Sequence, residues 1–247
     1  MHWIFKAIAG WIAFKILLLA VLWTLAFNGW QPFGSAKTAT GPLATPTPSV
    51  DDSIDRETSD PYTGNLERFD RDDRAEKLQV QKVMDLLGIK EGSRVADIGA
   101  GSGWFTMIAA DRVGADGRVF AVDISEESVK FINEKISREK RTNVETVLSK
   151  PEDPLLEASS IDAVLILNTY HEIAEPITFL RNLRKALKSK ALVGIIERDG
   201  SGGNHGIDVE VVKREAARAG FETKEVHDFV KADKMDYFLI IVPASGN

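Results

Sequence analysis

Cysteine is absent from the 247-residue chain. Its absence excludes disulfide frameworks, zinc fingers, iron–sulfur clusters and thiol nucleophiles, although it leaves the cellular compartment open. A surplus of positive charge is missing as well, because 31 Lys and Arg stand against 37 Asp and Glu, a formal net charge of −6. Proteins that bind duplex nucleic acid are usually basic, so we expect no nucleic-acid partner.

The polar face that a water-soluble helix needs is missing from the first 30 residues. Only Lys15 and Thr24 interrupt the apolar and small residues of 7–27. As a helix this run would be about 31 Å long, close to the roughly 30 Å hydrocarbon core of a bilayer. We therefore predict a single-pass membrane anchor over residues 1–30. A signal sequence that is cleaved near the small residues 34–36 is the alternative.

The charges beside this segment bear on its orientation. Lys6 and Lys15 lie toward its N-terminal side, whereas Asp51 and Asp52 lead the acidic residues that follow it. The positive-inside rule then places the N-terminus in the cytoplasm and the rest of the chain outside.

Regular periodicity is missing from residues 31–65, which hold five of the nine prolines among Thr, Ser, Gly and Ala. This composition is typical of an extended linker. We therefore assign one domain to residues 66–247.

Strand-like and helix-like segments alternate along this domain. Apolar or alternating runs predict strands at 94–98, 118–124, 143–148, 161–168 and 192–197, followed by a strand pair at 221–229 and 237–242. Amphipathic segments predict helices at 72–88, 103–112, 126–140, 175–188 and 207–219. The last two strands have no helix between them, so we expect them to pair antiparallel. The alternation favours a parallel sheet covered by helices on both faces, with 161–168 as a central strand.

A glycine-rich loop at 97–105, DIGAGSGWF, follows the first of these strands and opens a helix. Two known phosphate-binding motifs are missing from it. Trp104 stands where a dinucleotide-binding loop needs its third glycine, and no Gly-Lys-Ser/Thr follows to make a P-loop. Asp123 ends the next strand, 24 residues after Gly99. A carboxylate at that place can accept hydrogen bonds from both hydroxyls of a ribose.

The segments VADIGAGSGWFT (95–106) and VFAVDIS (119–125) resemble the first two motifs of the class I S-adenosylmethionine-dependent methyltransferases, and the likeness extends over roughly residues 70–242. It implies a Rossmann-like α/β fold with a seven-stranded, mostly parallel sheet, an antiparallel last strand and helices on both faces. It also implies S-adenosyl-L-methionine as the cofactor. The residues that it places at the cofactor are Asp97, Gly99, Ala100, Gly101, Gly103, Asp123 and Ile124, with Asp97 near the methionine ammonium.

Further candidates follow the third and the central strand. Members of the family often place a side chain beside the adenine amino group at the position of Glu152 and Asp153, and a solvated loop or helix cap is the alternative there. Asn168, Tyr170 and His171 follow the central strand, where the methyl acceptor is expected. Asn168 can hold the cofactor or the acceptor, and His171 can serve as a base. Packing roles are the alternative for Tyr170 and His171.

Two absences limit the chemistry. The signature Asn/Asp-Pro-Pro-Tyr/Phe of N-methyltransferases is missing, because Thr169 and Tyr170 follow Asn168, so an amine acceptor is not supported. The residues that could in principle hold a metal match no compact binding motif, and we predict none; they are His171, Glu172, Asp199, His205 and Asp208. The glycine-rich segment 200–206 can form a loop that closes over the site.

Together these features predict a methyltransferase that transfers a methyl group by in-line displacement to an unidentified acceptor, either a small molecule, a lipid or a membrane protein. The membrane would be a second partner, through the N-terminal helix. S-adenosylmethionine is made in the cytoplasm, whereas the flanking charges place the domain outside, so the side of the membrane stays open. A non-catalytic domain that binds S-adenosyl ligands or acts as a scaffold at the membrane is the alternative.

Overall fold

Strands and helices alternate through most of the part of the chain that the computed structural model describes, residues 52–54, 56–71, 73–200, 206–232 and 234–245. The predicted anchor at 1–30 lies outside these residues, as do most of the predicted linker and most of the loop at 200–206. Among the described residues, no helix has the length and apolar character needed to span a membrane.

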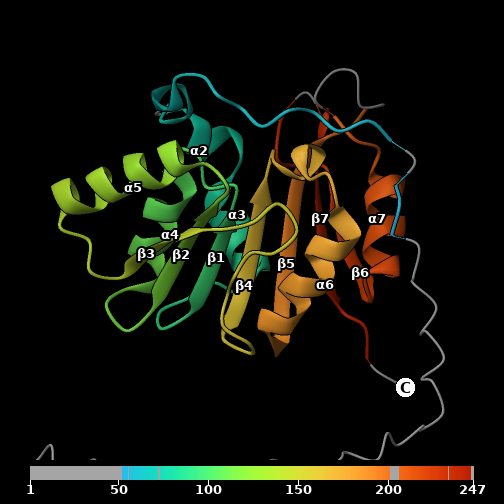
Figure 1. Cartoon of the computed structure of the whole chain (residues 1–247). Helices are drawn as coiled ribbons and strands as arrows, with labels where there is room; N and C mark the ends of the chain where they lie inside the picture. Colours follow the sequence, from blue (N-terminus) through green and yellow to red (C-terminus); the bar gives the residue numbers. More distant parts are fainter. Residues whose placement is uncertain (1–51, 55, 72, 201–205, 233, 246–247) are drawn as a thin grey trace, which may run out of the picture. The chain divides into compact units, whose positions relative to one another are not determined.

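The described strands form one sheet (Figure 1). They are β1 (Arg94–Ile98), β2 (Arg118–Asp123), β3 (Val144–Leu148), β4 (Ile161–Leu167), β5 (Leu187–Arg198), β6 (Phe221–His227) and β7 (Asp236–Pro243). Their order in the sheet is β3-β2-β1-β4-β5-β7-β6. The pairs from β3 to β5 are parallel, whereas β7 runs antiparallel to both β5 and β6. The predicted seven-stranded sheet with an antiparallel last strand is therefore confirmed.

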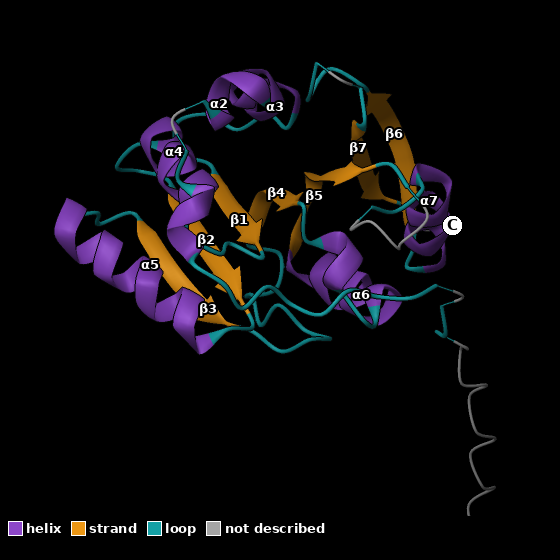
Figure 2. Cartoon of the chain, turned by 90° about the horizontal axis from the view of Figure 1, so that it is seen from above, coloured by secondary structure: helices purple, strands orange, loops and turns teal. Residues whose placement is uncertain are grey.

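Helices cover both faces of this sheet. They are α2 (Arg74–Lys77), α3 (Val80–Leu86), α4 (Trp104–Val113), α5 (Glu126–Glu139), α6 (Pro176–Ala186) and α7 (Val209–Arg218), with short 3-10 turns η1 (Leu66–Phe69) and η2 (Tyr170–Glu172). The helices α3 and α4 pack on one face, and α6 and α7 pack on the other (Figure 2). Neighbouring residues of β4 enter opposite cores, because Val164 joins the α6 side and Leu165 the α3 side. A strand buried on both faces explains the continuous apolar run of β4.

The helix predicted at 72–88 is broken in two. Gln79 adopts a left-handed conformation with φ 47° between α2 and α3, and its side-chain amide donates a hydrogen bond to the Phe229 carbonyl at 2.8 Å. Residues two apart on one helix point about 200° apart. The break allows both Leu78 and Val80 to be buried, which an unbroken helix would not.

The last residues of the predicted linker lie against the domain. We call residues 56–65 the strap; Figure 1 shows it crossing above the carboxyl ends of the strands. The Ser59 amide donates to the His171 carbonyl at 3.2 Å, and Arg56 Nε donates to Glu215 Oε1 at 2.8 Å. The strap therefore covers the edge of the sheet at which a ligand is expected to bind.

Candidate functional site

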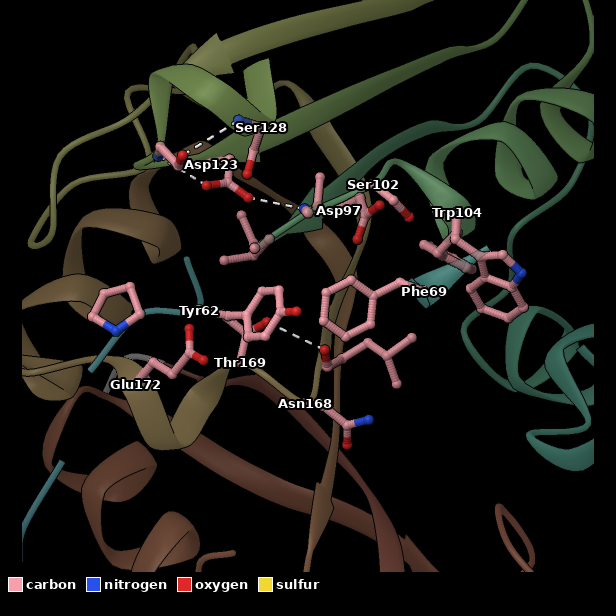
Figure 3. A pocket seen from close by; sticks show the side chains of 18 of the residues that line it. Tyr62, Phe69, Asp97, Ser102, Trp104, Asp123, Ser128, Asn168, Thr169 and Glu172 are labelled. Carbon is pink, nitrogen blue, oxygen red and sulfur yellow. Dashed lines mark hydrogen bonds between the residues drawn. The ribbon is translucent and has the colours of Figure 1, made fainter. Parts of the chain in front are cut away.

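A cavity of about 1020 Å³ lies at the carboxyl ends of β1, β2 and β4. Open α/β sheets bind their ligands at this edge. The strap, the η1–α2 region, the glycine loop and the segments that follow β2, β3 and β4 all contribute to its wall. Figure 3 shows Asp97 and Asp123 on one side of the view and Tyr62, Thr169 and Glu172 on the other.

The glycine loop is tightly bent, and it differs at Gly99 and Gly101 in the room that it leaves for a side chain. The amides of Gly99 and Ala100 both donate to the Val122 carbonyl, at 2.8 and 3.2 Å. Gly99 has a φ of +68°, and a Cβ there would lie 2.2 Å from the Thr169 side chain. At Gly101, in contrast, the nearest atom to such a Cβ is the Gly99 carbonyl oxygen at 3.9 Å. The loop therefore leaves open space at Gly101, which a ligand can fill.

Gly103 has a different position from the one that the family resemblance implies. It is not among the residues that line the cavity. It precedes α4 with a φ of +71°, and a Cβ there would lie 3.1 Å from Ile132. Gly103 thus allows α5 to pack closely against the loop.

Asp123 is held with part of its hydrogen-bonding capacity free for a ligand. Its Oδ2 accepts from the Gly101 amide and its Oδ1 from the Ser125 amide, each at 2.9 Å. Burial raises the pKa of the carboxyl group, and these amide hydrogen bonds oppose the shift. A carboxylate offers about four lone-pair sites, so acceptor capacity remains for a diol. Ile124, the next residue, is 43% exposed and also lines the cavity.

Opposite charges lie close together at the other end of the glycine loop. Asp97 is buried and accepts a hydrogen bond from Thr106 Oγ1 at 2.6 Å. Burial raises its pKa to about 6, while Thr106 and the charge of Arg74 oppose the shift. The Arg74 guanidinium lies 4.4 Å from the centroid of the Trp104 ring. Asp97 and Arg74 both line the cavity, and together they suit a ligand that carries an ammonium and a carboxylate.

These features fit S-adenosylmethionine. Asp97 and Arg74 would hold its amino-acid end, and Asp123 would hold its ribose. The open space at Gly101 would allow the cofactor to lie close to the backbone of the glycine loop. Of these residues, Arg74 was missed at the level of sequence. It lies in a segment with no motif.

The segment after β3 reaches the cavity through other residues than those predicted. Ser149, Lys150 and Pro151 line the cavity, whereas Glu152 and Asp153 do not. The Glu152 carbonyl accepts from Asn182 at 2.8 Å. Asp153 Oδ1 accepts from the Leu155 amide at 2.9 Å and so shapes its own loop.

Of the three candidates after β4, one lies in the cavity wall. Asn168 lines the cavity, in a left-handed conformation with φ 51°. Tyr170 is buried behind the wall, where its hydroxyl donates to Glu215 Oε2 at 2.9 Å. His171 is buried too, with Nδ1 3.0 Å from Glu197 Oε2. Neither lines the cavity, so direct contact of these two residues with the acceptor is corrected to supporting positions. The 3-10 turn η2 explains this, because its successive side chains point about 120° apart.

The turn instead presents Glu172 to the cavity. Burial raises the pKa of its carboxyl group to about 7. The sequence had marked Glu172 only as a weak metal candidate. Within the described residues, no three His, Cys, Asp or Glu side chains are grouped as metal ligands would be; His205 lies outside them.

Apolar side chains form much of the remaining wall. They are Tyr62, Leu66, Phe69, Leu78, Trp104, Phe105, Leu167, Ile173, Ala174 and Phe179. The rings of Tyr62 and Phe69 meet edge to face, with centroids 5.0 Å apart. Neither residue was a sequence candidate, since the strap and η1 carry no motif.

The buried carboxyl group of Asp97 makes ligand binding depend on pH. An ammonium group is held by the ionised form, and the pKa of Asp97 is raised to about 6. We therefore expect the affinity for S-adenosylmethionine to fall about tenfold per pH unit below about pH 6, measured by calorimetry. Thr106→Val removes a hydrogen bond that lowers this pKa, so the fall should begin at higher pH. An affinity that is constant between about pH 5 and 7.5 would contradict this role of Asp97.

The comparisons with known proteins agree with this geometry. Residues 89–201 match a family model described as a methyltransferase domain. A structure described as an S-adenosylmethionine-dependent methyltransferase from Aquifex aeolicus superposes with a TM-score of 0.65 and 27% identity, over 71% of this chain and 95% of that one.

Curated relatives match part of the chain. A protein-L-isoaspartate O-methyltransferase from Methanothrix thermoacetophila is 28% identical over 98 residues, 40% of this chain and 47% of the relative. A ubiquinone/menaquinone biosynthesis C-methyltransferase from Idiomarina loihiensis is 28% identical over 122 residues, 49% of each protein. The chain thus spans about half the length of these relatives. Together with the fold, the matches support a class I methyltransferase domain in this chain, with S-adenosyl-L-methionine as its cofactor.

Proposed function

We propose that the protein transfers the methyl group of S-adenosylmethionine to an uncharged, largely apolar acceptor that carries an acidic O–H or C–H group. The observation that carries this proposal is the division of the cavity. Asp97, Arg74 and Asp123 offer charges suited to the two polar ends of the cofactor, whereas the strap and η1 bring aromatic side chains to the space beside them.

The apolar wall supports a ring-shaped acceptor. Tyr62, Phe69 and Trp104 supply flat aromatic surface, and burying an apolar ring against such surface is favourable. One relative is named for ubiquinone and menaquinone biosynthesis and another for isoaspartate. For this chain we favour a quinol-like ring, because the aromatic side chains of the wall suit a flat, apolar acceptor.

The residues of the cavity would act mainly by positioning. When bound, the cofactor supplies a methyl group on a positively charged sulfur. Asp123 and Arg74 would fix the cofactor while the aromatic wall holds the acceptor, and such an arrangement lowers the entropic part of the barrier. The strap would keep water out of the cavity.

A pair of leucine substitutions in the full chain tests the cofactor site. Gly101 and Gly92 both have positive φ, +54° and +78°, and a Cβ meets no atom closer than 3.9 Å at Gly101 and nothing within 4 Å at Gly92. Each substitution should therefore cost a similar backbone strain of about 1–2 kcal/mol. Gly101 lines the cavity, whereas Gly92 does not. We expect Gly101→Leu to weaken the calorimetric affinity for S-adenosylmethionine at least about tenfold.

Gly92→Leu is the control and should bind normally. Equal affinities in the two variants would contradict the site. A wild-type protein that binds the cofactor but transfers no labelled methyl group to any member of an acceptor panel would favour the alternative, a ligand-binding or scaffolding domain.

The predicted membrane anchor bears on where the acceptor is found. The apolar run at 7–27 supports a single-pass anchor, and an acceptor in or near a membrane, whether a lipid, a quinone-like molecule or a membrane protein, would suit it. Cofactor supply favours a cytoplasmic domain and the flanking charges favour the opposite side. A reporter fused to the C-terminus distinguishes the two orientations.

A further inference from the structure

We propose that the carboxylate of Glu172 takes the proton from the methyl acceptor, and that His171 and Glu197 behind it are positioning residues. This inference rests on the proposed methyl transfer and adds to it the group that receives the proton.

Glu172 differs in its contacts from the other carboxylates of the cavity wall. Asp97 and Asp123 lie beside the glycine loop, where the cofactor is expected, and are held there by Thr106 and by backbone amides. Asp73 pairs with Lys77, and Asp60 is exposed to solvent. Glu172 remains as the wall carboxylate beside the apolar acceptor space.

The side chain of Glu172 lies in the wall beside Tyr62 and Thr169, as Figure 3 shows. It is 22% exposed, so an acceptor can reach it. The Tyr62 backbone amide favours the ionised form of its carboxyl group and lowers its pKa. Its carboxylate therefore has lone pairs that an acceptor in the cavity can reach.

Behind Glu172, an imidazole lies between two carboxylates. His171 Nδ1 is 3.0 Å from Glu197 Oε2, and its other ring nitrogen, Nε2, is 3.9 Å from Glu172 Oε1. Glu197 is completely buried near the end of β5. Burial opposes protonation of His171, but the hydrogen bond and the charge of Glu197 outweigh it and raise the pKa of the imidazole. Arg56, the cation that faces His171 from the strap, acts in the opposite direction.

The charges around Glu172 suit a group that must gain and lose a proton near neutral pH. Burial raises its pKa to about 7; Glu197 and Asp123 act in the same direction, whereas His171 and the Tyr62 amide oppose it. A base whose pKa lies near the working pH is the most effective. An ordinary exposed glutamate, with a pKa of about 4.3, would be a much weaker base.

The transfer balances in atoms and charge. The bond between the sulfonium sulfur and the methyl carbon breaks, and its electron pair stays on sulfur, which becomes a neutral thioether. The methyl carbon bonds to the acceptor oxygen or carbon, and the proton of that O–H or C–H passes to a Glu172 carboxylate oxygen. One positive and one negative charge therefore disappear together, which suits a cavity with an apolar wall. Glu172 then releases the proton to solvent.

The matched variants are Glu172→Gln and Glu175→Gln in the full chain. Glu175 lies three residues further on, is exposed and does not line the cavity. The probe is a demethylated naphthoquinol with labelled S-adenosylmethionine, and calorimetry with S-adenosylhomocysteine reports cofactor binding. We expect Glu172→Gln to reduce transfer about 10²- to 10⁴-fold with cofactor affinity unchanged, and Glu175→Gln to match the wild type. Unchanged transfer by Glu172→Gln would overturn the proposal.

A second readout needs no acceptor. Titration of isotope-labelled glutamate carboxyl groups by nuclear magnetic resonance should show a signal near pH 7 that Glu172→Gln removes. His171→Gln deletes a charge that lowers the pKa of Glu172, so the signal and the acid limb of the rate profile should move to higher pH. A Glu172 carboxyl that titrates at its ordinary value would overturn the proposal. Failure of the wild type and Glu175→Gln alike to transfer would count against the proposed function, and the titration would still decide the role of Glu172.

Discussion

Asp123→Ala is expected to weaken the binding of S-adenosylmethionine and S-adenosylhomocysteine by about 100-fold. The carboxylate lies at the end of β2 with acceptor capacity left after its bonds to the Gly101 and Ser125 amides. Hydrogen bonds to a charged group contribute about 1.5–3 kcal/mol each. At the lower end of this range, loss of two of them to a ribose diol amounts to about 3 kcal/mol, or about 100-fold in affinity.

Calorimetry with the purified full chain measures this effect. The control is Asp116→Ala, which removes the same charge from an exposed turn before the other end of β2. A thermal melt with each variant separates lost binding from lost folding, since Asp123→Ala also leaves two backbone amides without their acceptor. An Asp123→Ala affinity within about threefold of the wild type would show that this carboxylate does not hold the ligand.

Glu215→Ala is expected to destabilise the fold by about 3–5 kcal/mol. The Arg56 and Glu215 side chains are 11% and 6% exposed, and Arg56 Nε donates to Glu215 Oε1 at 2.8 Å. Tyr170 donates to the other carboxylate oxygen at 2.9 Å. Removal of the carboxylate leaves a buried guanidinium and a buried hydroxyl without this acceptor, and it loosens the attachment of the strap.

Chemical denaturation measures the free energy of unfolding. Glu210→Ala, on the same helix, is the control: its partner Lys213 is 2.7 Å away, but Glu210 is 63% exposed, so the loss should stay below about 1 kcal/mol. The double variant Arg56→Met with Glu215→Leu should recover much of the lost stability, because it removes the desolvated charges together. A Glu215→Ala loss of less than about 1 kcal/mol would mean that the strap is not anchored by this pair.

The strands could be predicted from the sequence because buried strands consist of short runs of apolar residues. The apolar run at 161–168 became the central strand β4, and the missing helix between 221–229 and 237–242 became the antiparallel pair of β6 and β7. The helix at 72–88 was predicted as one piece because periodicity alone does not reveal a left-handed residue such as Gln79.

Site residues that belong to short sequence motifs could be predicted, whereas the others could not. The cavity wall contains four of the predicted residues, Asp97, Gly99, Gly101 and Asp123. Their positions follow from the strand ends and the tight turn to which they belong. The segment at 168–172 was recognised as a site, but the order of its residues did not tell which of them would face the cavity.

The sequence by itself determined the sheet, the glycine loop and the two strand-end carboxylates, since these depend on short-range patterns of burial and backbone geometry. Tertiary structure alone decided which side chains meet. It turned Tyr170 and His171 into the interior and Glu172 toward the cavity. It also brought Arg56 to Glu215, 159 residues further along the chain, and Tyr62 over the site. Contacts between residues so distant in sequence follow from packing and charge pairing in three dimensions, which leave no periodic trace along the chain.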